Sequence, residues 1–286
     1  MLFKLDRMIN YSEITFVITT FKSEKIIFKC LSELPEISPK IIIENSGNFN
    51  LKNELKKNFQ NLECFVMEEN IGYGRANNIG ISKSKTNYIF IINPDTFLSK
   101  KNLDLFLSKI KKENFSIASV LENHDQKGNR FDGKEVIEVD HVKGFAMFLN
   151  KNYLFGNLFD ENFFLYLEEI DLCLNIKKNG GRIILVNVKI DHFGGNSHSN
   201  IQDLEMEKSR NWHWMWSKFY FTKKHYGFIF ALIKLLPHFF SAFIKYLFYM
   251  FIFNNKKKII YKMRLLGLLN SFILRKSTYR PYSKIN

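Results

Sequence analysis

Carboxylate, amide and imidazole side chains that could do chemistry follow several short apolar runs in this chain. The clearest case is Asp95, which comes after the apolar run 89–92 and the pair Asn93-Pro94. Proline cannot donate to a strand ladder, so a strand must end there and leave a carboxylate at its carboxyl end. In open α/β sheets, ligands bind at that edge. Asn, Pro and Asp are also common turn formers, so this stretch taken alone favours a simple turn.

A second acidic group comprises Glu168, Glu169 and Asp171, at the start of a helix predicted to continue to about residue 178. Gly180-Gly181 is the predicted C-cap of this helix. Three carboxylates in a first turn also complement the helix dipole, which needs no catalytic role. Catalysis needs at least one of them to face a cleft. There, a carboxylate can take a proton from an attacking hydroxyl.

Two further positions stand out by their place beside predicted strands. Gly144 lies inside the predicted strand 142–149, and a glycine within a strand often marks the close approach of a ligand or another backbone. His192 lies in a loop predicted to follow strand 182–188. Such a histidine is often only solvated, but imidazole is also a frequent ligand of divalent metal ions.

Strands and helices alternate over the first two hundred residues. The predicted strands are 14–20, 40–44, 62–67, 89–92, 116–121, 142–149 and 182–188, and the predicted helices between them are 24–34 (with Ser23 as N-cap), 51–59, 75–82 and 103–110. This alternation predicts an α/β fold with a doubly wound, mostly parallel, Rossmann-like sheet. The polar residues after the strands would then gather at one edge of the sheet.

The ordered set of motifs resembles the family 2 glycosyltransferases, which are inverting enzymes with the GT-A fold. The stretches that carry the resemblance are Thr19-Thr20-Phe21, Glu44-Asn45-Ser46, the run from Asn70 to Gly80, Asn93-Pro94-Asp95, the Gly144 strand, Glu168-Glu169-x-Asp171-Leu172 and His192 to Gly195. They cover roughly residues 14–200. The Asn-Pro-Asp variant, with Trp216 to Tyr220 and Lys224 to Gly227 after it, looks most like the rhamnosyltransferase-like branch used in surface polysaccharide assembly.

The sequence departs from the family's pattern at Asn93, where the first acid of an Asp-x-Asp pair is expected, and at Glu44 and Glu169, where aspartate is usual. The last two changes keep the charge. The resemblance implies a nucleotide-diphosphate sugar donor. The residues expected to bind it are Thr20, Glu44, Asn45, Asn70, Gly72, Arg75, Asn77, Asn93, Asp95 and Gly144.

The resemblance also implies catalytic and metal-binding roles. Asp95 and His192 would hold Mg²⁺ or Mn²⁺, which would neutralise charge on the leaving diphosphate. Glu169 would be the catalytic base, with Glu168 beside it contacting the acceptor or the sugar. Asp171 is expected to be structural or to orient its neighbours.

The excess positive charge is confined to the end of the chain. The net charge is +14, but residues 208–286 hold 16 Lys and Arg and no Asp or Glu, which leaves 26 basic against 28 acidic residues in 1–207. Residues 225–253 are mostly apolar and aromatic, with Lys234, His238, Ser241 and Lys245 on one helical stripe. Together with the segment 259–274, this pattern predicts helices lying in a membrane interface. A full span would put the cations in hydrocarbon, and packing on the catalytic domain is the alternative.

We therefore expect a GT-A glycosyltransferase domain in residues 1–207 and a basic, aromatic-rich helical membrane-association extension in 208–286. Residues 1–13 have no apolar stretch, so we expect no signal peptide. The enzyme would be cytoplasmic and peripheral on the inner face of the cell membrane, in contact with it through 225–275. It would move a sugar, on resemblance rhamnose from dTDP-rhamnose, to a lipid-linked glycan acceptor. With no recognisable motif for it, no nucleic acid is expected as partner.

Three alternatives remain open on the sequence. A catalytically disabled GT-A scaffold would bind nucleotide without turnover, and the departures at Asn93, Glu44 and Glu169 favour it. A transferase acting on a soluble or protein acceptor would differ only in the tail. A nucleotidyltransferase shares the sheet type but needs a Gly-rich first loop, which Thr20 to Lys25 lacks.

Overall fold

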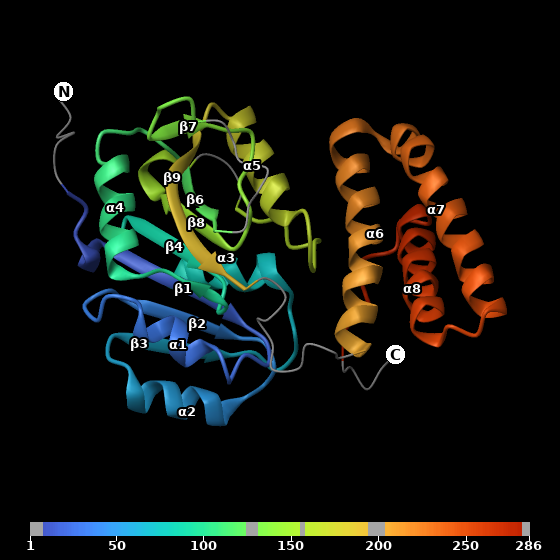
Figure 1. The fold of residues 1–286 in the computed structure, drawn as a ribbon, viewed down its shortest axis with the longest axis horizontal. Helices are drawn as coiled ribbons and strands as arrows, with labels where there is room; N and C mark the ends of the chain where they lie inside the picture. The colour runs from blue at the N-terminus through green and yellow to red at the C-terminus, as the bar shows by residue number, and fades with distance from the viewer. Residues whose placement is uncertain (1–7, 124–130, 155–157, 194–203, 282–286) are drawn as a thin grey trace. The chain divides into compact units, whose positions relative to one another are not determined.

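The computed structural model describes residues 8–123, 131–154, 158–193 and 204–281. The chain forms two compact units (Figure 1). The first unit comprises Met1–Ile71, Arg75–Phe159 and Glu169–Ile201, and the second comprises Gly72–Gly74, Asp160–Glu168 and Gln202–Asn286. Besides the C-terminal helices, the second unit thus includes two short stretches from earlier in the chain.

The first unit is built on one mixed sheet. Its strands are β1 (Ile14–Thr20), β2 (Lys40–Glu44), β3 (Leu62–Val66), β4 (Tyr88–Ile92), β5 (Thr96–Phe97), β6 (Ile117–Glu122), β7 (Val136–Glu138), β8 (Ala146–Asn150) and β9 (Ile183–His192), in the order β3-β2-β1-β4-β8-β6-β9-β5 with β7 beside β9. Strands β3, β2, β1 and β4 run parallel, as do β6 and β9. Strand β8 runs antiparallel between β4 and β6. The predicted α/β fold with a parallel-rich sheet is confirmed.

The helices connect and cover these strands or follow them. They are α1 (Ile27–Ser32), α2 (Phe49–Asn58), α3 (Tyr73–Lys83), α4 (Lys100–Ile110), α5 (Glu168–Lys178), α6 (Leu204–Tyr226), α7 (Phe228–Phe251) and α8 (Asn255–Phe272), with short 3₁₀ turns at Tyr11–Glu13 and Lys151–Tyr153. The predicted C-cap of α5 is confirmed, since Gly180 has φ +79° and Gly181 N donates to Ile176 O at 2.9 Å.

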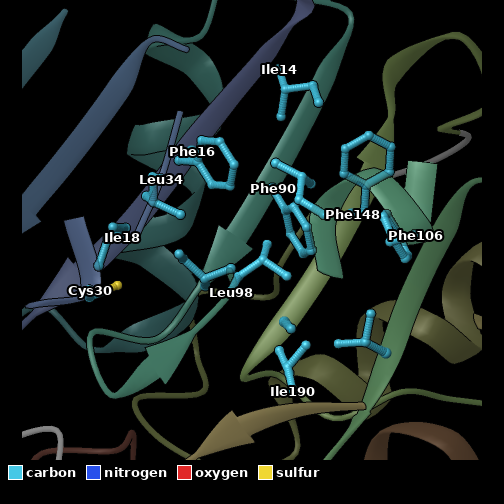
Figure 2. Packing of buried hydrophobic residues seen from close by; sticks show 14 of the residues in the cluster. Ile14, Phe16, Ile18, Cys30, Leu34, Phe90, Leu98, Phe106, Phe148 and Ile190 are labelled. Atoms are coloured by element: carbon cyan, nitrogen blue, oxygen red, sulfur yellow. The ribbon is translucent and has the colours of Figure 1, made fainter. Parts of the chain in front are cut away.

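Alternate residues of the central strands form the core. Figure 2 shows the Phe90 ring of β4 among Phe16 of β1, Phe148 of β8 and Phe106 of α4, with centroid distances of 5.7, 5.2 and 5.5 Å. The next residue of β1, Val17, points to the other face, where a Cβ on Gly80 of α3 would lie 2.3 Å from its Cγ1. Helices α4 and α3 therefore pack on opposite faces, as a doubly wound sheet requires.

The second unit consists mainly of α6, α7 and α8, which pack against one another (Figure 1). Met215 and Phe219 of α6, Ala231 and Leu235 of α7 and Leu268 of α8 form its buried centre. A Cβ on Gly267 of α8 would lie 2.3 Å from Trp212 O, so α8 and α6 approach closely there.

Several local predictions were wrong. Helix α1 begins at Ile27 with Ile26 as its N-cap, and the hydroxyl of Ser23, the predicted cap, bonds to Phe21 instead. Gly144 lies in a turn before β8 instead of inside the strand. His192 is the last residue of β9, paired with Thr96, instead of a loop residue. Gly194 and Gly195, which completed the predicted His-x-x-Gly motif, lie outside the described residues.

Candidate active site

Polar side chains gather where parallel strands of the first unit end. Thr20 ends β1 and Glu44 ends β2, and the two residues are register partners. Asp95 follows β4, and His192 ends β9. Because β8 is antiparallel to both β4 and β6, and β9 is parallel to β6, all four of these strands end at the same edge. This is the edge at which α/β sheets bind ligands.

Asp95 is held in place by backbone hydrogen bonds on both sides. Asn93 N donates to Phe145 O at 2.9 Å, Thr96 N donates to Asn93 O at 3.0 Å, and Phe193 N donates to Asp95 O at 3.1 Å. The turn that Pro94 imposes is thus tied to the segment before β8 and to the end of β9. The Asp95 side chain is only 1% exposed, and neither carboxylate oxygen makes a hydrogen bond within the described residues.

His192 faces Asp95 from one side and is anchored from the other. Its Nε2 lies 3.5 Å from Asp95 Oδ1, and its Nδ1 lies 2.5 Å from Glu122 Oε1. A carboxylate can only accept, so Nδ1 carries the hydrogen and Nε2 is left to face Asp95. The imidazole stacks on Phe145, with ring centroids 4.5 Å apart, and Lys143 forms an ion pair with Glu122 behind it. The ring therefore has one fixed orientation.

The charges around His192 set its protonation. Burial acts to lower the pKa of His192, but the carboxylates of Asp95 and Glu122 outweigh burial and hold this pKa above its ordinary value. Burial acts to raise the pKa of Glu122, while Lys143 and His192 hold it below the usual range for a carboxyl. A cation at Asp95 would compete with the proton on His192, because both are attracted by the same carboxylate.

The pair of Asp95 and His192 fits a divalent cation. Buried carboxylate oxygens without partners are costly, and a hard cation would satisfy them. A carboxylate oxygen beside an imidazole nitrogen suits Mn²⁺, and Glu122 behind the imidazole is the usual outer support of a metal-binding histidine. No group of three or more His, Cys, Asp or Glu that could hold a metal exists among the described residues. The remaining ligands would come from a bound diphosphate or water.

Two unpaired donors lie beside this edge. Thr20 Oγ1 and Asn77 Nδ2 are buried and have no hydrogen-bond partner within the described residues. The neighbouring Thr19 Oγ1 donates to Asn77 Oδ1 at 3.2 Å, which fixes the amide and joins the end of β1 to α3. A hydroxyl and an amide left unsatisfied at a ligand-binding edge are suited to the oxygens of a nucleotide.

Glu44 is fully buried, and its carboxylate organises the loop after β2. It accepts hydrogen bonds from the Ser46 amide at 2.9 Å, from the Ser46 hydroxyl, and from the Asn48 amide at 2.7 Å. Asn48 in turn caps α2, since its Oδ1 accepts from Leu51 N at 2.9 Å. Asn45 N continues the ladder by donating to Thr20 O at 2.8 Å. A base contact for Glu44 or Asn45 stays a prediction.

A close backbone contact requires glycine at position 72, in the loop before α3. Gly72 has φ +87°, and a Cβ there would lie 2.6 Å from Phe164 O, which also accepts from Tyr73 N at 3.0 Å. These residues belong to the second unit. Asn70 is half-buried, and Arg75 is exposed on the first turns of α3. Nucleotide contacts for Asn70, Gly72 and Arg75 stay predictions, as do those for Asn93 and Gly144.

Glu168 and Glu169 begin α5, and the two residues before them have a strained backbone conformation. Tyr166 and Leu167 both have left-handed φ, +72° and +71°, immediately before Glu168. Such residues cost on the order of 1–3 kcal/mol each and persist only where the surroundings impose them. Glu168 is buried and Glu169 is half-buried. Asp171 is fully buried and accepts from Asn175 Nδ2 at 3.2 Å, which fits the expected structural role.

Helix α6 holds the segment 160–168 within the second unit. Lys224 Nζ lies 2.7 Å from Asp160 Oδ2, and Ser217 Oγ donates to Leu165 O at 2.8 Å. The His213 ring stacks on Phe164 with centroids 4.4 Å apart. These contacts with α6 stabilise the strained turn at Tyr166 and Leu167, just before the acidic pair.

Comparison with known proteins decides the family. Residues 15–167, more than half of the chain, match the domain described as glycosyl transferase family 2. The chain belongs to glycosyl transferase family 2. The matched range contains the Asp95 turn and ends just before the acidic pair.

Two relatives of this glycosyltransferase are named as sugar transferases. The low-salt glycan biosynthesis hexosyltransferase Agl10 of Haloferax volcanii is 24% identical over 193 residues, with 58% of this chain and 62% of Agl10 covered. The rhamnosyltransferase WbbL of Escherichia coli (strain K12) is 20% identical over 181 residues, with 50% of this chain and 68% of WbbL covered. The match thus spans less than two thirds of Agl10.

Solved structures confirm the GT-A type of fold. The mannosyltransferase PcManGT of Pyrobaculum calidifontis, solved with GDP-Man and Mn²⁺, superposes with a TM-score of 0.58 at 10% identity, over 91% of this chain and 86% of PcManGT. GalNAc-T7, solved with UDP, GalNAc and Mn²⁺, gives a TM-score of 0.51 at 14% identity, over 63% and 42% of the two chains. At these identities the likeness concerns the fold alone.

Sequence reasoning missed two residues that shape this glycosyltransferase site. Glu122 anchors His192, a contact between residues 70 positions apart in the chain. Asp160 anchors the segment before α5 to Tyr220 and Lys224 of α6, most of which lies in the predicted helical extension. The run of carboxyl groups near position 160 was a visible signal; nothing in the sequence pointed from Glu122 to His192.

Proposed function

We propose that this glycosyltransferase is a metal-dependent, inverting enzyme. It would transfer a sugar, rhamnose from dTDP-rhamnose, to a lipid-linked glycan at the cytoplasmic face of the membrane. The rhamnosyl specificity rests on the Asn-Pro-Asp variant of the strand-end motif and on the likeness to WbbL. The hexosyltransferase Agl10 supports the broader assignment to sugar transfer in glycan synthesis.

One observation carries the proposal. Asp95 is buried at the ligand-binding edge, neither of its oxygens makes a hydrogen bond within the described residues, and His192 Nε2 faces Oδ1 at 3.5 Å in a fixed orientation. A disabled scaffold would have no reason to keep a buried carboxylate without hydrogen bonds, since such a group is costly to bury. Asp95 and His192 would hold Mg²⁺ or Mn²⁺, and the cation would neutralise charge that develops on the leaving diphosphate.

The protein's own groups supply the rest of the chemistry. Thr20 and Asn77 would bind the nucleotide through their unpaired donors. The acceptor hydroxyl would attack the anomeric carbon from the face opposite the diphosphate, so that the new C–O bond forms with inversion as the bond to the diphosphate breaks. Glu169 would take the hydroxyl proton, and Glu168 would contact the acceptor or the sugar. The rigid turn before α5 would keep these carboxylates in position.

The acceptor and location are proposed from the C-terminal helices. Helix α7 is the described helix long and apolar enough to cross a membrane by length and composition alone. Lys234 and Lys245 lie along it, and a surface position would spare them burial in hydrocarbon. We therefore place the helical unit on the membrane surface, where a lipid-linked acceptor is concentrated.

The decisive experiment measures nucleoside-diphosphate release by the purified protein. It offers dTDP-, UDP- and GDP-sugars with Mn²⁺ or Mg²⁺, with and without a membrane lipid extract. The tested variant is Asp95→Asn, which removes the charge and keeps the shape. The matched control is Asp132→Asn, an exposed aspartate in the same unit.

The expected result is release with one donor that depends on both metal and extract, is lost in D95N and persists in D132N. Release that needs only a soluble acceptor would refute the lipid-linked acceptor. Nucleotide binding with no release from any donor, even with a defined polyprenyl-diphosphate-linked glycan added, would refute the transferase and favour the disabled scaffold.

A further inference from the structure

The second unit contains a pocket that the proposed transfer reaction does not use. It has a volume of about 360 Å³ and lies among α6, α7 and α8, beside Pro237. Three of its lining residues carry positive charge: Lys218 from α6, Lys245 from α7 and Arg264 from α8; the imidazole of His238 also lines it. Trp214 and Tyr261 provide aromatic walls.

Within the described part of the chain, Lys218, Lys245 and Arg264 form no ion pair with a carboxylate. No Asp or Glu occurs anywhere from residue 208 to the end of the sequence. Lys218 Nζ lies 4.6 Å from the Trp214 ring centroid, and Lys245 Nζ lies 5.5 Å from that of Tyr261. Arg264 also covers Tyr261 and donates through Nε to Asn211 Oδ1 at 2.8 Å. Aromatic and amide groups therefore orient the cations without cancelling their charge.

The cations also repel one another. Burial lowers the pKa of Lys218, and the nearby charges of Arg264 and Lys234 lower it further. Like charges in a partly buried pocket repel one another, and a bound anion would offset this unfavourable free energy. The pocket therefore has the electrostatics of an anion site.

The surface next to the pocket is apolar. His238, Ser241 and Lys245 follow one stripe of α7. Beside this stripe, Phe240, Ile244 and Phe248 are exposed by 53%, 64% and 55%. Large aromatic and aliphatic side chains in water are unfavourable, and a cation beside such a face is typical of a helix at a lipid interface. A soluble anion would explain the cations and leave the apolar face unexplained.

We propose that this pocket binds the phosphate group of an anionic membrane phospholipid while the exposed face of α7 lies among the acyl chains of the same leaflet. The inference rests on the membrane location proposed above. It adds that membrane binding is selective for anionic lipid, because the phosphate enters a built pocket instead of meeting a diffuse positive surface.

The test measures binding of the full-length protein to sedimenting vesicles. One vesicle type is phosphatidylcholine alone, and the other contains about one third phosphatidylglycerol. The pocket variant is K218Q/K245Q/R264Q. The matched control is K256Q/K257Q/K258Q, which removes the same charge from the start of α8. These three lysines do not line the pocket.

A diffuse field is worth about 1 kcal/mol per Lys or Arg near an anionic surface, so charge alone would weaken both triple variants equally. We expect the pocket variant to lose at least about tenfold more affinity for phosphatidylglycerol vesicles than the control variant. Such a loss corresponds to about 1.4 kcal/mol of binding free energy from the pocket beyond the diffuse charge. The phosphatidylcholine vesicles should show no such difference between the two variants.

Equal losses in the two triple variants would overturn the pocket, as would equal binding of the native protein to both vesicle types. Competition by millimolar inorganic diphosphate without competition by glycerol phosphate would assign the pocket to a soluble anion instead. Stronger binding to phosphatidylcholine vesicles doped with a polyprenyl phosphate than to phosphatidylglycerol vesicles would assign it to the carrier of the acceptor and refute the phospholipid.

Two controls keep the result interpretable. If the triple variant does not fold, K245Q against K245R separates loss of charge from loss of packing at one position. The vesicle assay contains neither donor nor acceptor, so its failure leaves the transferase proposal standing. Conversely, D95N, which removes transfer in that proposal, should bind vesicles as the native protein does.

Discussion

His213 should make the helical unit sensitive to mild acid. Its ring lies inside the unit, fully buried on α6. Nε2 lies 2.9 Å from Tyr279 O, which can only accept, so Nε2 carries the hydrogen. Nδ1 lies 3.0 Å from Ser277 Oγ and accepts from it. The neutral ring thus satisfies both nitrogens, and protonation of Nδ1 would put a charge in a buried site.

The cost of that charge can be worked out. Burial, with the positive charge of Arg280 nearby, lowers the pKa of His213 from 6.5 to about 3, although the Tyr279 carbonyl opposes the shift. Below about pH 6.5, His213 therefore binds a proton in the unfolded chain but stays neutral in the folded unit until the pH approaches 3. Stability from His213 is complete above pH 6.5 and is lost as the pH falls towards 3. Near pH 5 the loss is about 2 kcal/mol.

The assay uses a property of this sequence. All 3 tryptophans lie between positions 212 and 216 of α6, so intrinsic tryptophan fluorescence reports unfolding of the helical unit alone. Urea unfolding is followed at about pH 7.5 and pH 5 for the native protein and for His213→Gln, which keeps a donor for the Tyr279 carbonyl. The variant should be less stable at pH 7.5, yet lose about 2 kcal/mol less than the native protein between the two values.

Ser217→Ala is the control on the same helix. It removes the hydrogen bond to Leu165 O and should cost about 1 kcal/mol at both pH values, since no titrating group is lost. If His213→Gln keeps the whole pH dependence of the native protein, then His213 takes up its proton equally in the folded and unfolded states, and the reasoning from burial is refuted.

Three further predictions concern the active site and the helical packing. Glu122→Gln should weaken Mn²⁺ binding about 10–100-fold in calorimetry with nucleoside diphosphate present, because His192 loses its anchor; unchanged affinity would remove His192 from the metal site. Glu169→Gln should lower transfer about 10²–10⁴-fold while donor binding, measured by calorimetry, persists; full transfer would reject the assigned base. Gly267→Ala should destabilise the helical unit by about 1–3 kcal/mol in fluorescence-monitored urea unfolding, because its Cβ meets Trp212 O; native stability would disprove the close packing.

Elements with local signals could be predicted from the amino-acid sequence. Strands β1 and β2 occur at the predicted residues because β-branched apolar runs end in small or polar residues there. Pro94 ends the β4 segment and places Asp95 at the ligand-binding edge, and Gly180 closes α5. Each of these features depends on backbone preferences within a few residues, which the sequence displays directly.

Other features of the site depend on contacts that form only when the chain packs. His192 joins β9 because Thr96 offers it a partner strand, and it faces Asp95 because Glu122 anchors its other nitrogen. The Glu44 carboxylate accepts hydrogen bonds from the loop before α2, and no pattern in the sequence predicted these contacts. The basic stripe of α7 was visible in the sequence, but Lys218 and Arg264 completed the pocket from two other helices. Such contacts join residues far apart in the chain, and their free energy depends on burial and orientation, which arise only when the whole unit packs.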